Sequence, residues 1–353
     1  MPTPRYDTLI IGQGLAGSAL AWQLIDAGQR VAVVDDGHLS SSSIVAAGLI
    51  NPLAGLRFTR RPELDDWLAA ATTWYAALAA AFGRDFYHPL PMLRLLRSAE
   101  QRRFYERRGQ DPLSRPLLDE AFTAATCPEP LHAPFGGFIQ RQTGFVDLPN
   151  LLDALRHWLR ERATLIERTL RYDEIRLDDT GVELMGLRAT RIVFCDGARL
   201  RDNPWFGGLP LMPEKGEILN VIVPDWPLRH IVNGAFWMVP QGDGEIRLGA
   251  THDHHRCDQQ PTDAGQSTLL AGFAALRPDL PPPRVTQQVA GIRPGTRDRY
   301  PLIGHADDNA ALWVFNGFGA RGSLTIPWYA QCLAQHLVHA RPLPAEADIG
   351  RFK

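Results

Sequence analysis

A cluster of glycines followed by two acidic residues is the part of the sequence best suited to chemistry. Gly12-Gln13-Gly14-Leu15-Ala16-Gly17 has the GxGxxG spacing. Asp35-Asp36 follow about twenty residues later, where a carboxylate can accept a hydrogen bond from a ribose hydroxyl. In this pattern Gly12 permits a tight turn, Gly14 lets the backbone approach a pyrophosphate, and Gly17 allows close helix–strand packing. These residues predict a dinucleotide-binding site.

The elements around the glycine cluster are those that such a site requires. Tyr6–Ile11 is a short apolar run typical of a buried parallel strand. Ser18–Ala27 carries apolar residues at helical spacing and ends before Gly28, and Arg30–Val34 is a second apolar run. Together they form a βαβ unit, and its helix would direct unpaired N–H groups and a positive dipole end at the phosphates.

The motif alone does not distinguish FAD from NAD. Its position near the start of the sequence and its single occurrence favour FAD as a tightly held cofactor. The stretch Ile44–Pro52, rich in small residues, follows the acidic pair and favours FAD further. A flexible loop is the alternative interpretation of that stretch.

Two other clusters contain residues that could bind metals or phosphates. His252-Asp253-His254-His255 lies close to Cys257, but side chains alternating out of a strand or turn seldom converge on one ion. We therefore expect a solvated loop and no metal there. Six arginines lie between Arg94 and Arg108 and could face the phosphates of tRNA. Interrupting glutamates and interspersed leucines instead favour a charged, solvated helix with one buried face.

Composition limits the class of protein. A chain of 353 residues suits about two domains, and 45% hydrophobic with 22% charged residues is typical of soluble globular proteins. The net charge of −2 provides no overall basic field for nucleic acid or anionic lipid. Four cysteines are scattered without CxxC spacing, and no apolar run has the length of a membrane span. We therefore expect a cytoplasmic protein with no membrane span.

Several motifs, in order along the chain, resemble those of one enzyme family. They are Ala46-Ala47-Gly48, Gly144–Pro149, Arg191–Ala198, Phe236–Pro240, Gly244–Thr251, Ala290–Thr296, Tyr300–Gly304 and Asn316–Ser323. The family is the D-amino-acid oxidase (DAO) superfamily of FAD-dependent oxidoreductases. The chain resembles its glycine and sarcosine oxidases and the FAD oxidase domain of the enzyme that makes methylaminomethyl-uridine in tRNA. Cys195-Asp196 departs from the family's usual Ala-Thr at that position.

The resemblance implies non-covalent FAD and a set of flavin contacts. Besides the GxGxxG turn and the acidic pair, the implied contacts are Ala47, Gly48, Gly197, Gly317, Gly319, Ala320, Arg321, Gly322 and Ser323. The helix that opens near this last segment would stabilise negative charge on the reduced flavin. Thr325 is the expected N-cap of that helix, with Pro327 in its first turn.

The resemblance also implies the substrate-binding residues. It assigns Arg293 to the substrate carboxylate, which the planar guanidinium can hold in two parallel hydrogen bonds; a structural salt bridge is the alternative. It makes Trp237 an aromatic wall of the substrate cavity. His252 could hydrogen-bond the substrate or assist deprotonation of its amine; the alternative is a structural role, which is the more common one for a lone histidine. Arg321 is either a second anion-binding group or an outward-facing loop charge.

The implied fold is α/β, with a Rossmann-like FAD-binding domain and a second α+β substrate domain built on an antiparallel sheet. The FAD-binding domain would comprise residues 1–85, 145–204 and 288–353, and the substrate domain residues 86–144 and 205–287. Both domains are therefore expected to be discontinuous in sequence.

The predicted reaction is the FAD-dependent oxidation of a small amino acid or N-substituted glycine. A hydride would pass to flavin N5, giving an imine and then an oxo acid, with O2 or another electron acceptor. One alternative is an oxidase acting on carboxymethylaminomethyl-uridine in tRNA; another is a non-catalytic flavin-binding protein. The composition does not favour nucleic acid as a partner, and it leaves the oligomeric state open.

Overall fold

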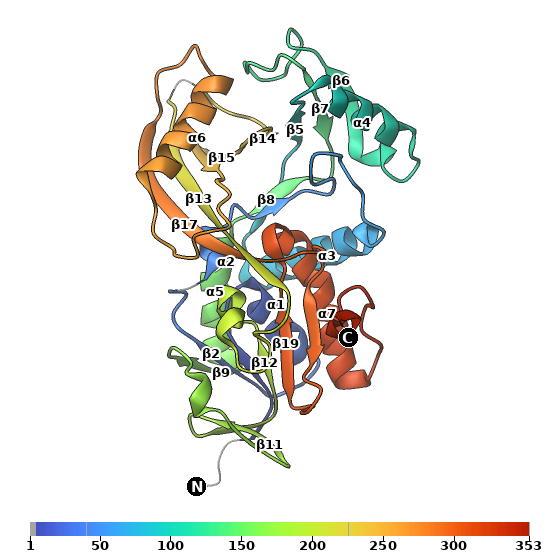
Figure 1. Ribbon diagram of the computed structural model, residues 1–353, viewed down its shortest axis with the longest axis vertical. Helices are drawn as coiled ribbons and strands as arrows, with labels where there is room; N and C mark the ends of the chain where they lie inside the picture. Colours follow the sequence, from blue (N-terminus) through green and yellow to red (C-terminus); the bar gives the residue numbers. More distant parts are fainter. Residues whose placement is uncertain (1–4, 40, 225, 353) are drawn as a thin grey trace.

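The protein is described by a computed structural model that covers residues 5–39, 41–224 and 226–352. Two eight-stranded sheets dominate the fold, and we call them the lower and upper sheet after their places in Figure 1. In the described ranges, no helix combines the length and the apolarity needed to cross a bilayer.

The lower sheet has the order β10-β11-β12-β1-β2-β9, with β19 paired to β12 and β18 to β19. Its strands are β1 (Arg5–Ile11), β2 (Val31–Asp35), β9 (Thr164–Glu167), β10 (Arg176–Asp178), β11 (Gly181–Leu184), β12 (Leu187–Phe194), β18 (Leu302–His305) and β19 (Leu312–Asn316). Strands β9, β2, β1, β12 and β19 are parallel. Their carboxyl ends therefore meet at one edge, which is where ligands bind in sheets of this type.

Helices cover one face of the lower sheet. They are α1 (Leu15–Asp26), α5 (Leu148–Arg162) and α7 (Gly322–His339), and α3 (Leu64–Phe82) packs in turn on α7. Side chains alternate along each strand, so Ile10 and Val33 pack against these helices while Leu9 and Ala32 pack on the opposite face. That opposite face is covered by the β10–β11 hairpin and by residues around η3 (Gly197–Asp202).

The predicted βαβ unit is confirmed. β1, α1 and β2 follow in the expected order, and β1 pairs in parallel with β2. The helix begins at Leu15, three residues earlier than the apolar spacing suggested, because the glycine turn leads directly into it.

The upper sheet has the order β17-β13-β16-β15-β14-β5-β7-β6. Its strands are β5 (Met92–Leu95), β6 (Leu118–Phe122), β7 (Gly137–Gln140), β13 (Leu211–Ile222), β14 (Ile231–Asn233), β15 (Trp237–Gly242), β16 (Glu245–Gly249) and β17 (Arg284–Thr296). Neighbours are antiparallel except β14 and β5. Helix α6 (Asp263–Leu276) covers one face through Leu269 and Phe273.

The remaining elements are smaller. They are a three-stranded sheet of β3 (Leu49–Ile50), β8 (Gly144–Val146) and β4 (Tyr87–Pro89), the helices α2 (Ser42–Val45) and α4 (Ala99–Gln110), and the 3-10 turns η1 (Arg115–Leu117), η2 (Tyr172–Glu174), η4 (Gly319–Arg321) and η5 (Ile349–Phe352). The architecture is the predicted one: a Rossmann-like sheet with helices beside a mainly antiparallel second sheet. Strand β17 runs continuously across the proposed boundary at residues 287 and 288, and the division into domains remains a proposal.

Two local expectations are wrong. The stretch Arg94–Arg108 was expected to be one solvated helix, but the helix begins only at Ala99. Arg94 lies on β5 instead, and only 6% of it is exposed. Thr325 is not an N-cap, since α7 begins at Gly322 with Arg321 at the N-cap. The Thr325 hydroxyl instead donates to the Arg321 carbonyl, as threonine does inside helices.

Candidate functional site

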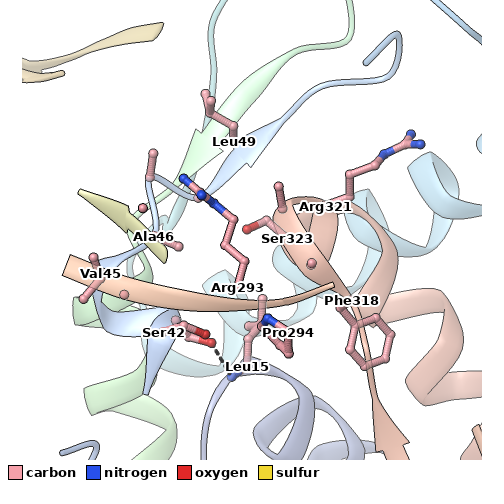
Figure 2. A pocket seen from close by; sticks show the side chains of 18 of the residues that line it. Leu15, Ser42, Val45, Ala46, Leu49, Arg293, Pro294, Phe318, Arg321 and Ser323 are labelled. Atoms are coloured by element: carbon pink, nitrogen blue, oxygen red, sulfur yellow. Dashed lines mark hydrogen bonds between the residues drawn. The ribbon is translucent and has the colours of Figure 1, made fainter. Parts of the chain in front are cut away.

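A cavity of about 570 Å³ is lined by residues of both large sheets and of the segments between them. Figure 2 shows part of its lining. It brings together most of the predicted site residues: Gly12, Gly14, Ala16, Asp35, Asp36, Ala47, Gly48, Gly197, Trp237, His252, Arg293, Gly319, Ala320, Arg321, Gly322 and Ser323. Gly17 and Gly317 lie outside the lining.

Packing explains why the first turn contains glycines. Gly12 has a φ of +97°, and a Cβ there would lie 2.6 Å from the Cys195 carbonyl oxygen. A Cβ on Gly17 would lie 1.8 Å from the Gly12 carbonyl oxygen. Gly14 forms the N-cap of α1 without a side-chain capping bond, and a Cβ there would meet nothing closer than 3.4 Å. The turn therefore exposes a helix N-terminus to the cavity, which suits phosphate.

The Asp35 carboxylate, at the carboxyl end of β2, is held by four donors. The backbone N–H groups of Gln13 (2.8 Å), Gly37 (2.9 Å) and His38 (3.1 Å) donate to it, as does Arg156 Nη1 from α5 (2.9 Å). Burial alone would raise the pKa of Asp35, but these hydrogen bonds hold it below its usual value. Asp35 is therefore ionised at neutral pH. Sequence analysis missed Arg156, because its place in α5 resembles that of a surface arginine.

The small-residue segment beside the cavity is fixed from two sides. Gly48 has a φ of +68°, and a Cβ there would lie 2.0 Å from the Val146 carbonyl oxygen. Arg247 of β16 donates from Nη2 to the Val45 carbonyl (2.7 Å) and from Nη1 to the Ala46 carbonyl (3.2 Å). The segment is therefore an ordered part of the cavity wall, and its interpretation as a flexible loop is not supported.

Asn316 links the end of β12 to the glycine-rich segment before α7. Its Nδ2 donates to Asp196 Oδ1 and to the Gly197 carbonyl (both 3.0 Å), while its Oδ1 accepts from the Gly317 N–H (2.8 Å). Tyr172 donates to the second Asp196 oxygen (2.8 Å). Burial raises the pKa of Asp196 to about 6 despite these donors. The departure from the family pattern thus has a structural role in this chain.

Arg321 lines the cavity but packs sideways. Its Cζ lies 4.8 Å from the centre of the Trp67 ring, and its Nη2 contacts the Pro52 carbonyl at 3.4 Å. Burial lowers the pKa of Arg321 to about 10. In Figure 2 its side chain points away from Arg293. The two predicted anion-binding arginines therefore face different parts of the cavity.

Arg293 rises from β17 toward the segment that contains Ala46 (Figure 2). Its Nη1 forms an ion pair with Glu214 Oε2 at 3.0 Å, across the pair of strands β13 and β17. Gly216 makes room for the guanidinium, because a Cβ there would lie 2.2 Å from Arg293 Nη2. Arg293 therefore has the predicted salt bridge and also faces the cavity.

Glu214 also contacts two histidines. His252 Nδ1 lies 2.9 Å and His254 Nε2 lies 3.2 Å from Glu214 Oε1. Burial would raise the pKa of Glu214, but its contacts with His252, Arg293 and His254 lower it overall. No group of metal-binding side chains was found among the described residues, and these histidines instead contact a carboxylate. A lone glutamate in a strand gives no sequence signal, and Glu214 was missed.

The cavity face of the upper sheet presents three side chains on neighbouring strands. Trp237 of β15 pairs with Asn233 of β14, which pairs with Arg94 of β5. A Cβ on Gly249, opposite Trp237, would lie 2.4 Å from the indole, so glycine is needed beside the ring. All three side chains line the cavity. Sequence analysis found only Trp237, since Arg94 was assigned to a solvated helix.

Comparison with protein families agrees with this geometry. The family model described as FAD dependent oxidoreductase (DAO) matches residues 7–336. The chain is 27% identical over 361 residues to glycine oxidase from Pseudomonas aeruginosa, and the match covers 95% of each protein. The fold is similar to the crystal structure of glycine oxidase from Geobacillus kaustophilus, with a TM-score of 0.85 and 26% identity over 99% of this chain and 98% of that one.

A third relative is a longer protein. The chain is 27% identical over 368 residues to the tRNA 5-methylaminomethyl-2-thiouridine biosynthesis bifunctional protein MnmC from Marinobacter nauticus. That match covers 95% of this chain but only 56% of MnmC. The chain is thus similar to two kinds of protein at nearly equal identity.

Proposed function

The chain belongs to the DAO family of FAD-dependent oxidoreductases, and we propose on that premise that it oxidises a small amino acid or an N-substituted glycine. It is an oxidoreductase that acts on amine donors and binds FAD non-covalently. The observation that supports the proposed substrate class is Arg293, a guanidinium directed into the cavity from the upper sheet.

The residues of the cavity fit FAD. We propose that the pyrophosphate binds at the N-terminus of α1 beside Gly14, and that Asp35 accepts a ribose hydroxyl. Among the described residues the Ser41 hydroxyl is buried without a hydrogen-bond partner, and it lines the same region. When bound there, FAD would supply the hydride acceptor for the oxidation.

Arg293 would hold the substrate carboxylate. Glu214 uses Nη1, which leaves further guanidinium donors for a ligand in the cavity. The Trp237 ring would form a wall that orients the carbon–hydrogen bond of the substrate. In this arrangement the substrate would be held by its carboxylate, and its amine would form no fixed ion pair with the protein.

We propose that His252, which lines the cavity, helps to remove a proton from the amine. A neutral His252 that donates from Nδ1 to Glu214 keeps Nε2 as an acceptor. Loss of a hydride from carbon and a proton from nitrogen gives an imine, which water converts to an oxo acid and an amine. O2 or another acceptor would then reoxidise the cofactor.

The test is anaerobic titration of the purified yellow protein with glycine, sarcosine and D-proline while flavin absorbance is recorded. We expect bleaching by at least one of them, with an apparent dissociation constant raised about 10- to 100-fold in Arg293→Ala. Arg103→Ala, an exposed arginine of α4, is the matched control. A protein that no amino acid bleaches would contradict the proposed substrate class.

The second candidate is oxidation of carboxymethylaminomethyl-uridine in tRNA. The nearly equal identity to MnmC supports it, although this chain corresponds to about half of that protein. Flavin bleaching by tRNA that carries this modification, with none by free amino acids, would favour it. A yellow protein bleached by neither would favour a non-catalytic role. We also propose a cytoplasmic location, which is compatible with four unpaired cysteines.

A further inference from the structure

Arg94 lines the cavity at a place that the proposed reaction does not use. Arg94 stands on β5 of the upper sheet, and only 6% of the residue is exposed. Its Nη2 donates to the Gly55 carbonyl at 3.2 Å, and its Cζ lies 5.0 Å from the centre of the Phe58 ring. These contacts position the guanidinium without neutralising it.

The surroundings of Arg94 are neutral. Its partners in the neighbouring strands are Asn233 and Phe138, and the covering segment contributes a carbonyl and a phenyl ring. Among the described residues it takes part in no ion pair, whereas Arg293 has Glu214. A buried cation without an acidic partner is costly, so such a side chain is expected to meet an anion that comes from outside the chain.

Arg94 lies on the same face of the upper sheet as the proposed substrate wall. Asn233 separates it from Trp237, and neighbouring strands are about 4.8 Å apart, so its Cα is roughly 10 Å from that of Trp237. Strand β17, which carries Arg293, stands at the other end of the row, beyond β13, β16, β15 and β14. The two arginines therefore lie on strands at opposite ends of this row.

We propose that Arg94, with Asn233, forms a subsite for a second anionic group of the substrate. The substrate class is then an amino acid or N-substituted glycine whose far end carries a carboxylate or a phosphate. This inference rests on the proposed function, because Arg293 is taken to hold the first carboxylate. The inference goes beyond the proposed function in specifying the length of the substrate and the negative charge at its far end.

Binding can be measured without turnover. Carboxylates that occupy the cavity are expected to perturb the flavin absorbance, so the holoenzyme is titrated with glutarate, adipate and suberate and with the monocarboxylates of equal chain length. In wild type we expect the best dicarboxylate to bind about 10- to 100-fold more tightly than its monocarboxylate. Arg94→Gln should remove that ratio and leave monocarboxylate binding unchanged, and Arg94→Lys should restore part of it.

Controls separate the subsite from folding and from the reaction. Arg103→Gln, on the exposed side of α4, should keep the wild-type ratio. Flavin content and melting temperature report the fold, and the dicarboxylate should raise the melting temperature of wild type more than that of Arg94→Gln. Because no oxidation is involved, the result stands even if no tested amine bleaches the flavin.

The origin of the anion is tested with ω-phosphonocarboxylates of the same lengths. Tighter binding of these than of the dicarboxylates identifies a phosphate as the natural group, and weaker binding identifies a carboxylate. A ratio that stays the same in wild type and Arg94→Gln, or a variant that weakens both ligand series equally, would overturn the proposal.

Discussion

Gly17 is the residue at which the nucleotide-binding turn tolerates least change. A Cβ at this position would lie 1.8 Å from a backbone oxygen, so Gly17→Ala must displace α1 from β1. We expect a loss of stability of about 1–3 kcal/mol and a clear loss of bound flavin. The ratio of flavin to protein absorbance after gel filtration measures the second effect.

Gly109→Ala is the control for that substitution. Gly109 lies in α4, and a Cβ added there would meet no atom within 4 Å, so alanine should be neutral or stabilising by up to about 1 kcal/mol. Full flavin content in Gly17→Ala would show that the turn accommodates a side chain after all.

Asp196 predicts a pH-dependent stability. Burial raises its pKa from 3.8 to about 6, so folding favours the protonated form. The associated stabilisation is complete below pH 3.8 and is lost as the pH rises through 6. Relative to Asp196→Asn, the free energy of unfolding of wild type should therefore fall by up to about 3 kcal/mol as the pH rises from about 4 to 6, and should change little at higher pH. Urea unfolding of both proteins across this range checks it; parallel curves would contradict the assignment.

At the residue scale, the sequence revealed positions constrained by local geometry and missed those constrained by tertiary contacts. The GxGxxG glycines were recognisable because turn, phosphate and packing all act within one short segment. Glu214 and Arg94 gave no such signal, since their partners come from distant strands. Arg94 was also misassigned, because Leu93 and Leu96 have the i,i+3 spacing of a helical face, although the segment is a strand.

At the scale of elements, Arg156 attaches α5 to β2. Its guanidinium bonds to Asp35 Oδ1 at 2.9 Å and to Gln13 Oε1 at 2.6 Å, and all three residues are buried. Arg156→Met leaves the Asp35 carboxylate without its counter-charge, so we expect a loss of about 3–5 kcal/mol. Urea unfolding at neutral pH measures the change.

Arg160 on the same helix offers the comparison. It pairs with Glu167 at 2.5 Å, but both side chains are about half exposed, so Arg160→Met should cost at most about 1 kcal/mol. Equal losses in the two variants would mean that the buried contact is not what joins α5 to the sheet.

Helices and strands were predictable where a single pattern of apolar residues continued along the whole segment. The apolar runs of β1 and β2 and the helical spacing of α1 need only local patterns. The start of α7 was predicted too late, because the glycines at its N-terminus give no helical signal in the sequence. Thr325 has a side chain typical of N-caps but lies inside the helix. The pairing of β13 with β17 depends on strands far apart in sequence, and no local pattern predicts it.

At the scale of the whole molecule, the cofactor should stabilise both sheets together. The cavity is lined by residues of the lower sheet, the upper sheet and the segments between them. FAD at about 100 times its dissociation constant should add about 2.7 kcal/mol to the free energy of unfolding. Differential scanning calorimetry of apo and holo protein should therefore show a higher melting temperature with FAD. Identical temperatures would mean that FAD does not bind the folded protein in preference to the unfolded chain.

The origin of the cavity wall in segments far apart along the chain has a consequence during synthesis. The turn at Gly12–Gly17 leaves the ribosome early, but β19 and the segment Gly319–Ser323 are translated roughly three hundred residues later. Until then β12 lacks its neighbour β19, and α1 lacks α7. A nascent chain therefore lacks part of the cavity wall, and the face of α1 that packs on α7 stays uncovered, until these last segments have been synthesised.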